Sequence, residues 1–254
     1  MHRAIHAILL SVFATTATTA TTAANAQTRL SPAETRFSVG GSFIISQPKE
    51  GFSQAIGNGY GGGGGVIYNL TRSGLLAVRF DISGVQYGHE TKTVPLSGTV
   101  GSRILVDVNT SNSITAITWG PELAKPTGRV RPYVNFGYSA LFFRTTSSVE
   151  DVDSSEGDAF HTTNFKDSTR AWVYGGGLRI QLGGRNSPVT LDTGVRYYRG
   201  GTVSYLREGS IQDNPDGTIT MTPLTSKTPF LAYTVGVKFR IPYNSNRQCA
   251  RFLC

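Results

Sequence analysis

The chain has 254 residues, a formal net charge of +8, 30 glycines, 11 tyrosines and 13 phenylalanines. Beyond the N-terminal region no window is apolar enough for a membrane-spanning helix, which excludes a helical membrane protein. The basic residues are dispersed rather than clustered, so we expect no nucleic-acid partner. The two cysteines, Cys249 and Cys254, lie too near the end of the chain to form a disulfide framework; they either close a small loop or stay unpaired.

The N-terminus has the three-part layout of a secretory signal peptide. A basic start over residues 1–3 is followed by a mostly apolar stretch over 4–14 and a Thr/Ala tract that ends in Ala24-Asn25-Ala26. Small residues at the two positions read by a signal peptidase predict cleavage between Ala26 and Gln27. The alternative, a transmembrane anchor, is disfavoured because the apolar stretch is too short to cross about 30 Å of hydrocarbon as a helix.

Eight later segments alternate between apolar and polar residues with the period of two that is typical of β-strands. Each segment has about 11–16 residues, whereas strands of soluble proteins usually have about 5–6 and a tilted strand that crosses a bilayer needs about 9–11. Their length therefore favours membrane-spanning strands. The predicted strands cover residues 35–46, 58–70, 74–86, 112–123, 129–144, 169–182, 188–200 and 228–241.

The last of these segments alternates most clearly. Its odd-numbered positions from Leu231 to Ile241 are all apolar, whereas its even-numbered positions include Lys238 and Arg240. The fourth segment is the weakest, and the pattern does not fix which face of residues 114–119 points outward.

Short and long connections alternate strictly along the chain. Three links have about three to five residues, and the four that start after residues 46, 86, 144 and 200 have about 11 to 27. This is the asymmetry of a membrane barrel with short periplasmic turns and longer outer loops. We therefore predict an all-β fold, an eight-stranded antiparallel up-and-down transmembrane β-barrel in the cell outer membrane. Residues 1–26 are the expected signal peptide, 27–241 the barrel and 242–254 a periplasmic C-terminal tail.

Three of the long loops carry features of their own. Asn214-Pro215-Asp216-Gly217 predicts a tight turn between hairpin arms over residues 205–211 and 218–221. Residues 95–98 predict a similar hairpin in the second long loop. The third, over residues 147–167, is acidic and poor in apolar residues, so we expect it to be mobile.

An eight-stranded barrel has an interior that side chains can fill, without a wide channel. Charged residues recur at the polar positions of the predicted strands, and exposing an arginine to lipid at the midplane would cost about 2–4 kcal/mol. We therefore expect them to form a polar network in the lumen in which each aspartate contacts an arginine. The candidate network consists of Arg79, Asp81, Arg131, Arg179, Asp192, Arg196, Lys238 and Arg240.

The run of five glycines over residues 61–65 lacks the Lys-Ser/Thr ending of a phosphate-binding loop. It indicates a closely packed, strongly bent strand where bulky residues of neighbouring strands fill the space. Aromatic residues near the predicted strand ends form either interfacial belts or ordinary cross-strand contacts. The candidates are Tyr60, Tyr68, Trp119, Tyr138, Trp172, Tyr233 and Phe239.

The segments over residues 119–123 and 128–138, and the closing strand from Tyr233 to Ile241, resemble strands of the family of small bacterial outer-membrane β-barrels. The resemblance covers the mature chain as a pattern rather than as a motif. It implies recognition by the barrel-assembly machinery. From the net positive charge we expect contact with outer-membrane lipid and lipopolysaccharide, and because no motif predicts a cofactor site we expect no cofactor. The chain differs from the family's usual ending on an aromatic residue, because residues 242–254 follow.

The pattern is typical of a non-enzymatic surface barrel that protects the envelope or binds through its loops. An enzyme acting on lipid or peptide is an alternative, with His89 and His161 in the outer loops, but no spacing predicts a catalytic triad. A soluble lipocalin-type barrel would need the reverse faces, with an apolar interior. The acids over residues 150–158 could hold Ca²⁺ with oxygen ligands, but they do not match the EF-hand pattern, so we expect a solvated acidic loop and no metal site.

Overall fold

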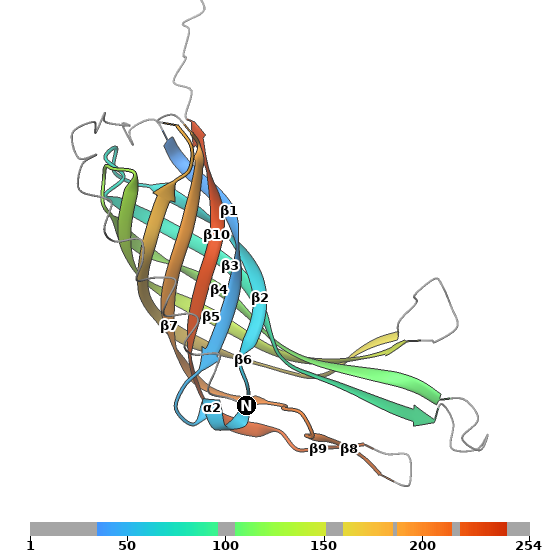
Figure 1. Cartoon of the computed structure of the whole chain (residues 1–254). Helices are drawn as coiled ribbons and strands as arrows, with labels where there is room; N and C mark the ends of the chain where they lie inside the picture. The colour runs from blue at the N-terminus through green and yellow to red at the C-terminus, as the bar shows by residue number, and fades with distance from the viewer. Residues whose placement is uncertain (1–34, 96–104, 151–159, 185–186, 215–218, 243–254) are drawn as a thin grey trace, which may run out of the picture.

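The structure is a computed structural model and describes residues 35–95, 105–150, 160–184, 187–214 and 219–242 (Figure 1). The expected signal peptide, the acidic residues 151–158, the turn residues 215–217 and both cysteines lie outside these residues. So does the expected tail, apart from residue 242. No helix in the described ranges is long and apolar enough to span a membrane.

Eight strands close into one barrel in which every neighbouring pair is antiparallel, which confirms the predicted fold class. Their order around the barrel is β1-β10-β7-β6-β5-β4-β3-β2. The strands are β1 (Thr35–Pro48), β2 (Gly59–Asn69), β3 (Leu76–Pro95), β4 (Leu105–Ala124), β5 (Val130–Glu150), β6 (Phe160–Gln181), β7 (Val189–Tyr205) and β10 (Leu224–Pro242). Barrel strands that follow one another along the chain also lie side by side in the wall, and β1 pairs with β10 to close it.

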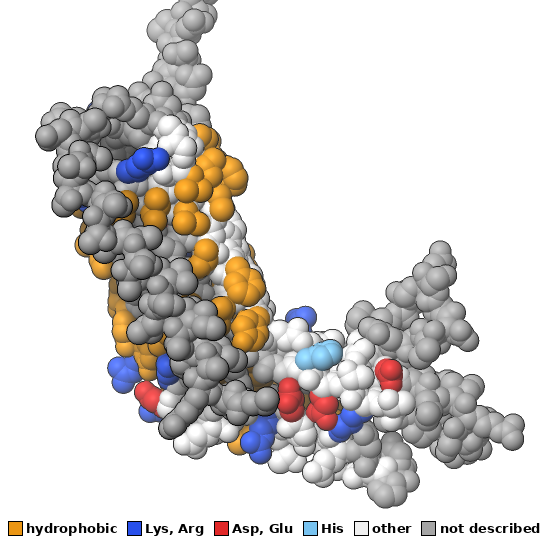
Figure 2. Space-filling view, in the orientation of Figure 1, with side chains coloured by type: hydrophobic (Ala, Val, Ile, Leu, Met, Phe, Trp, Pro, Cys, Tyr) orange, Lys and Arg blue, Asp and Glu red, His pale blue; other side chains and the backbone are white. Residues whose placement is uncertain are grey.

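The alternation in the sequence separates an apolar outer wall from the lumen. On β10, Val235 is 55% exposed and Phe239 51%, whereas Lys238 between them is 6% exposed. On β4 the structure fixes the face that the sequence left open, because Ile114, Ala116 and Thr118 are buried and Trp119 points outward. Orange hydrophobic side chains therefore cover the barrel wall in Figure 2. This exterior contradicts the lipocalin alternative, which needs a polar one.

Each of the three short turns contains a glycine with positive φ, a conformation that other residues rarely adopt. These are Gly74 (φ 70°) between β2 and β3, Gly128 (113°) between β4 and β5, and Gly183 (81°) between β6 and β7. All three turns lie at one end of the barrel, which we call the short-turn end. The long connections lie at the opposite, long-loop end.

Much of two predicted long loops is strand. β3 and β4 remain paired from the barrel out to Pro95 and Leu105. β4 and β5 remain paired out to residues 107 and 150, and β5 and β6 out to residues 149 and 160. Residues 147–150 and 160–167, which we expected to lie in a mobile loop, pair their main chains as strands, and the Thr, Ser and Val residues among them suit this pairing. The four strands form one sheet that projects beyond the barrel (Figure 1). We call this sheet the β3–β6 extension.

The connection between β7 and β10 contains a small hairpin of β8 (Ile211–Asp213) and β9 (Ile219–Met221), whose pairing confirms the predicted hairpin arms. The first arm is shorter than predicted, because residues 206–210 run along β3 instead. Tyr87 donates a hydrogen bond to the Leu206 carbonyl at 3.1 Å, and Lys92 donates to the Ile211 carbonyl at 2.9 Å. Burial raises the pKa of the Tyr87 phenol above its usual range.

An apolar core fills the long-loop half of the lumen. The short helix α2 (Phe52–Ala55), between β1 and β2, places the Phe52 ring 5.3 Å from that of Tyr205 and 6.3 Å from that of Phe143. Phe52 is 1% exposed. Further buried members of this core are Ile44, Val85, Ile114, Leu141, Val173, Tyr198 and Phe230. The charges therefore occupy only the other half of the lumen.

Candidate functional site

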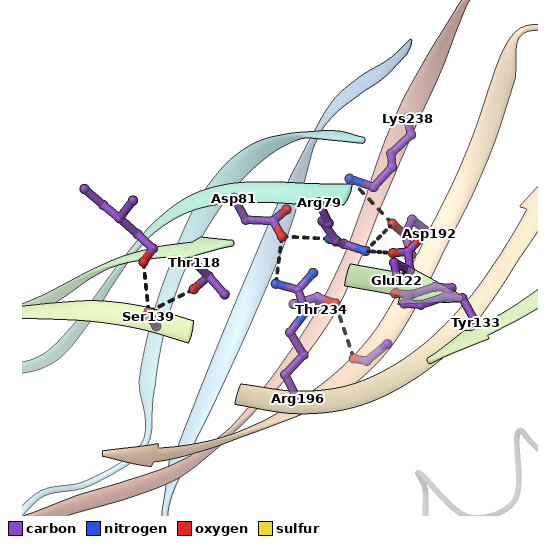
Figure 3. Close-up of polar contacts among 12 residues, drawn as sticks. Arg79, Asp81, Thr118, Glu122, Tyr133, Ser139, Asp192, Arg196, Thr234 and Lys238 are labelled. Atoms are coloured by element: carbon purple, nitrogen blue, oxygen red, sulfur yellow. Dashed lines mark hydrogen bonds and ion pairs between the residues drawn. The ribbon is translucent and has the colours of Figure 1, made fainter. Parts of the chain in front are cut away.

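Seven ionisable side chains from five strands form one connected network in the short-turn half of the lumen. Figure 3 labels all of them except Arg179. Each is largely buried, with side chains between 0% and 14% exposed. The members are Arg79 and Asp81 on β3, Glu122 on β4, Arg179 on β6, Asp192 and Arg196 on β7, and Lys238 on β10.

Arg79 is the centre of this network. Its Nε lies 2.7 Å from Asp81 Oδ2, and its Nη1 lies 3.2 Å from Glu122 Oε2 and 3.5 Å from Asp192 Oδ2. One guanidinium thus contacts all three buried acids. The planar fork of donors in arginine suits this role, whereas a lysine would act as a single point charge.

The remaining contacts leave every acid in the network with at least two basic partners. Asp81 also binds Arg196 Nη1 at 3.0 Å, and Glu122 also binds Arg179. Asp192 Oδ2 lies 3.6 Å from Lys238 Nζ. Buried charges are tolerated only when they are paired and hydrogen-bonded, and this arrangement pairs them.

Tyr133 on β5, the strand between those of Glu122 and Arg179, joins the network. Its hydroxyl donates to Asp192 Oδ1 at 2.7 Å. The guanidinium carbon of Arg179 lies 4.5 Å from the centre of the same ring, and that of Arg79 lies 5.5 Å away. Tyr133 therefore supplies a hydrogen bond to an acid and a cation–π face to two bases.

Two of the charges expected in the network bind main-chain carbonyls instead. Arg131 Nε donates to the Lys125 carbonyl at 2.7 Å, and Arg240 Nη2 donates to the Ser187 carbonyl at 2.5 Å. Both acceptors belong to the short-turn end, next to the turns. Of the eight charged residues singled out from the sequence, the structure thus brings six together and places Arg131 and Arg240 at the rim.

Sequence reasoning missed Glu122 and Tyr133. Glu122 has a side chain that is 0% exposed, and it links Arg79 to Arg179. The signal for it was present, since Glu122 lies four residues from Thr118 on the same face of β4. That face stayed ambiguous because Ile114 points inward and Trp119 outward, so both faces carry apolar residues.

Glycines on neighbouring strands leave room for several of these long side chains. Five members of the network and Tyr133 each lie directly across from a glycine on a neighbouring strand. A Cβ built on Gly65, for example, would overlap the Asp81 carboxylate. The expectation that neighbours fill the space over the glycine run is confirmed there. These pairs are Arg79 with Gly120, Asp81 with Gly65, Tyr133 with Gly177, Asp192 with Gly236, Arg196 with Gly175 and Lys238 with Gly40.

Several of the aromatic candidates make cross-strand ring contacts, and most of them face outward on the barrel wall. Trp119, Tyr138 and Trp172 form a row across β4, β5 and β6, with ring centroids 5.5 Å and 5.2 Å apart. Trp119 and Trp172 are also more than 40% exposed on the barrel wall. Tyr60, Tyr233 and Phe239 are exposed on the wall as well, whereas Tyr68 is half-buried against Phe37.

The enzyme alternative relied on two loop histidines. His89 lies on the β3–β6 extension, where its main-chain N–H donates to Glu208 at 3.2 Å. The side chain of His161 lies outside the part of the chain that the structure describes. Across the described ranges, no three His, Cys, Asp or Glu side chains gather as a metal-ligand set.

A closed antiparallel barrel with an apolar outer wall and a filled lumen is a transmembrane β-barrel. No protein family and no curated protein sequence matches the chain. Among solved structures, the attachment invasion locus protein Ail of Yersinia pestis is 13% identical over 82% of this chain and 99% of its own, with a TM-score of 0.44.

Two further solved structures are also similar to this chain. A major outer membrane protein from Thermus thermophilus is 16% identical over 80% of this chain and 99% of its own, with a TM-score of 0.43. Neisserial surface protein A is 14% identical over 81% and 97%, with a TM-score of 0.38. The fold assignment rests on the strand pairing of this chain and not on these likenesses.

Proposed function

We propose that the chain is a non-enzymatic outer-membrane protein whose closed barrel anchors a sheet at the cell surface. The observation that carries this proposal is the β3–β6 extension, which continues the barrel wall beyond its apolar part. On β3 the last exposed hydrophobic residue of the wall is Ile82, and the strand continues to Pro95. Such a sheet is held by main-chain pairing and needs no separate domain.

The orientation follows from the two ends. Barrels of bacterial outer membranes have short turns on the periplasmic side and longer loops outside. The three glycine turns therefore face the periplasm and the β3–β6 extension faces the exterior. The filled lumen supports a role as an anchor, because ion pairs in one half and the Phe52 core in the other leave no wide channel along the described barrel.

Lipopolysaccharide is the lipid partner that we propose for the outer rim. On three neighbouring strands the first outward position beyond the last aromatic residue of the wall is an exposed arginine. Phe142 is followed by Arg144 on β5, Trp172 by Arg170 on β6, and Tyr197 by Arg199 on β7. Aromatic rings at the interface with cations just above them match an outer leaflet that carries phosphate groups.

A groove on the outer side of β4, β5 and β6 extends this rim. Its volume is about 580 Å³, and Phe142, Arg144 and Lys166 contribute to its lining. Arg144 lies directly across from Lys166, and like charges in such a pair repel unless an anion lies between them. The one carboxylate in the lining, Asp167, already accepts hydrogen bonds from the Ser168 and Ser204 main-chain amides.

Labelling of intact cells tests surface display. Cys249 and Cys254 are first replaced by serine, and single cysteines are then introduced as Thr91→Cys on the extension or Ser73→Cys in a short turn. Both positions are exposed. A membrane-impermeant maleimide is expected to label Thr91→Cys on intact cells and Ser73→Cys only after lysis. Labelling of Ser73→Cys alone on intact cells would reverse the orientation, and labelling of neither would contradict surface display.

A further inference from the structure

A cavity of about 30 Å³ lies between the ion-pair network and the short-turn end of the lumen. Its lining includes Arg131, Arg179, Lys238 and Arg240, together with the Ser38 and Thr190 hydroxyls. None of the described residues that line it is an acid. Arg129 also reaches it and is exposed, so the cavity connects with solvent at the rim.

The strand register imposes this concentration of positive charge. Arg131 on β5 lies directly across from Arg179 on β6. Two like charges at directly opposed positions destabilise a sheet. Glu122 compensates Arg179, but Arg131 makes no ion pair with an acid among the described residues, and the same holds for Arg240.

Two donors at this cavity lack acceptors. The Nε atoms of Arg179 and Arg240 are buried and have no hydrogen-bond partner within the described part of the chain, although Arg179 Nε lies 3.9 Å from Asp192 Oδ2, within the range of an ion pair. Arg179 has a side chain that is only 9% exposed, so solvent does not readily replace the missing acceptor. A buried charged donor without an acceptor is costly, and such groups mark sites that an ion or water fills.

We propose that this cavity binds one small oxoanion of the phosphate class. Guanidinium groups recognise such oxygens through short charge-assisted hydrogen bonds. The two Nε donors that lack a hydrogen-bond acceptor supply these bonds, the Lys238 ammonium adds charge, and the Thr190 hydroxyl adds a neutral donor. The volume holds one or two water molecules or a single small oxoanion, which excludes a nucleotide or a whole lipid headgroup.

The proposal is tested on the full-length protein folded in detergent micelles. Sodium phosphate is titrated against sodium chloride at equal ionic strength, while the ¹⁵N NMR signals of the arginine Nε–H groups are followed. We expect the Arg179 and Arg240 signals to shift and to saturate with phosphate only. Signals that do not saturate, or that shift equally with chloride, would overturn the proposal.

Two variants and a control identify the site. Arg240→Gln is expected to weaken phosphate binding by about tenfold, the effect of one charge-assisted bond. Arg240→Lys keeps the charge but loses the Nε donor, so an intermediate loss is expected. Arg72→Gln removes an exposed cation from the β2–β3 turn at the same end of the barrel and should change the affinity less than twofold. An equal loss in Arg72→Gln would overturn the proposal. If Arg240→Gln fails to fold, the phosphate titration of the wild-type protein still tests whether the cavity binds the anion.

Discussion

The hydroxyl of Tyr133 donates a hydrogen bond to Asp192 at 2.7 Å, although β6 lies between their two strands in the barrel wall. The bond therefore bridges part of the lumen instead of following the sheet. It satisfies an acid whose other oxygen faces Arg79 and Lys238. Contacts of this kind fix the shape of the charged half independently of main-chain pairing.

Tyr133→Phe removes this hydroxyl and keeps the ring. Because Asp192 then loses a buried donor, we expect the free energy of unfolding to fall by about 1–3 kcal/mol. Urea unfolding in detergent, followed by tryptophan fluorescence, measures the change. Tyr174→Phe on the lipid-facing wall is the matched control and should change stability by less than about 0.5 kcal/mol. Equal effects of the two variants would contradict the structural role of the Tyr133 hydroxyl.

Glu122→Gln removes the charge that links Arg79 to Arg179. Breaking a buried ion pair by removing one partner typically costs about 3–5 kcal/mol, because the remaining charges lose their compensation. The same unfolding assay should show a loss of this size. Glu208→Gln on the exposed loop beside His89 serves as the control, and its expected cost is about 1 kcal/mol or less. A small effect of Glu122→Gln would show that the network tolerates excess positive charge.

Gly65→Ala and Gly64→Ala form a matched pair on β2. A Cβ on Gly65 would overlap the Asp81 carboxylate, whereas one on Gly64 points outward with its nearest atom, the Gly40 carbonyl oxygen, at 3.4 Å. We expect Gly65→Ala to destabilise by about 1–3 kcal/mol through overpacking. Gly64→Ala should stay within about 0.5 kcal/mol. Unfolding midpoints of the two variants, measured side by side, check the prediction, and the reverse order would contradict the inward direction of Gly65.

Replacement of Arg144, Arg170 and Arg199 by glutamine tests the outer rim. Binding to vesicles that contain lipopolysaccharide should fall by about tenfold or more, since up to three charge-assisted contacts are lost. The wild-type affinity should also decrease with added salt, whereas that of the triple variant should depend on salt less. A triple variant with unchanged affinity would remove the basis for lipopolysaccharide as the partner.

The alternating sequence predicted the wall because inward and outward positions differ in polarity on most strands. On β10, Val235, Val237 and Phe239 alternate with Gly236 and Lys238, so the face of every residue followed. The alternation of long and short connections predicted the order and direction of the strands, because adjacent antiparallel strands need only a short turn between them.

The rest depended on contacts that a local pattern does not contain. Glu122 binds Arg79 across 43 residues, and the register that brings them together follows only from the closed sheet. Phe52 lies in a four-residue helix, which is too short to show a hydrophobic period. The strands of the β3–β6 extension are rich in Ser and Thr on both faces, so they have little polarity contrast and the alternation does not reveal them as strands.

Gel mobility of the outer-membrane fraction, with and without boiling, tests the central claim that this chain is a membrane barrel. A folded barrel should remain with the membrane after urea or carbonate extraction and should migrate at a different position when it is not boiled. Glu122→Gln should reduce the proportion that keeps this mobility on warming. A protein that is released by extraction and shows one mobility in both states would contradict the membrane barrel.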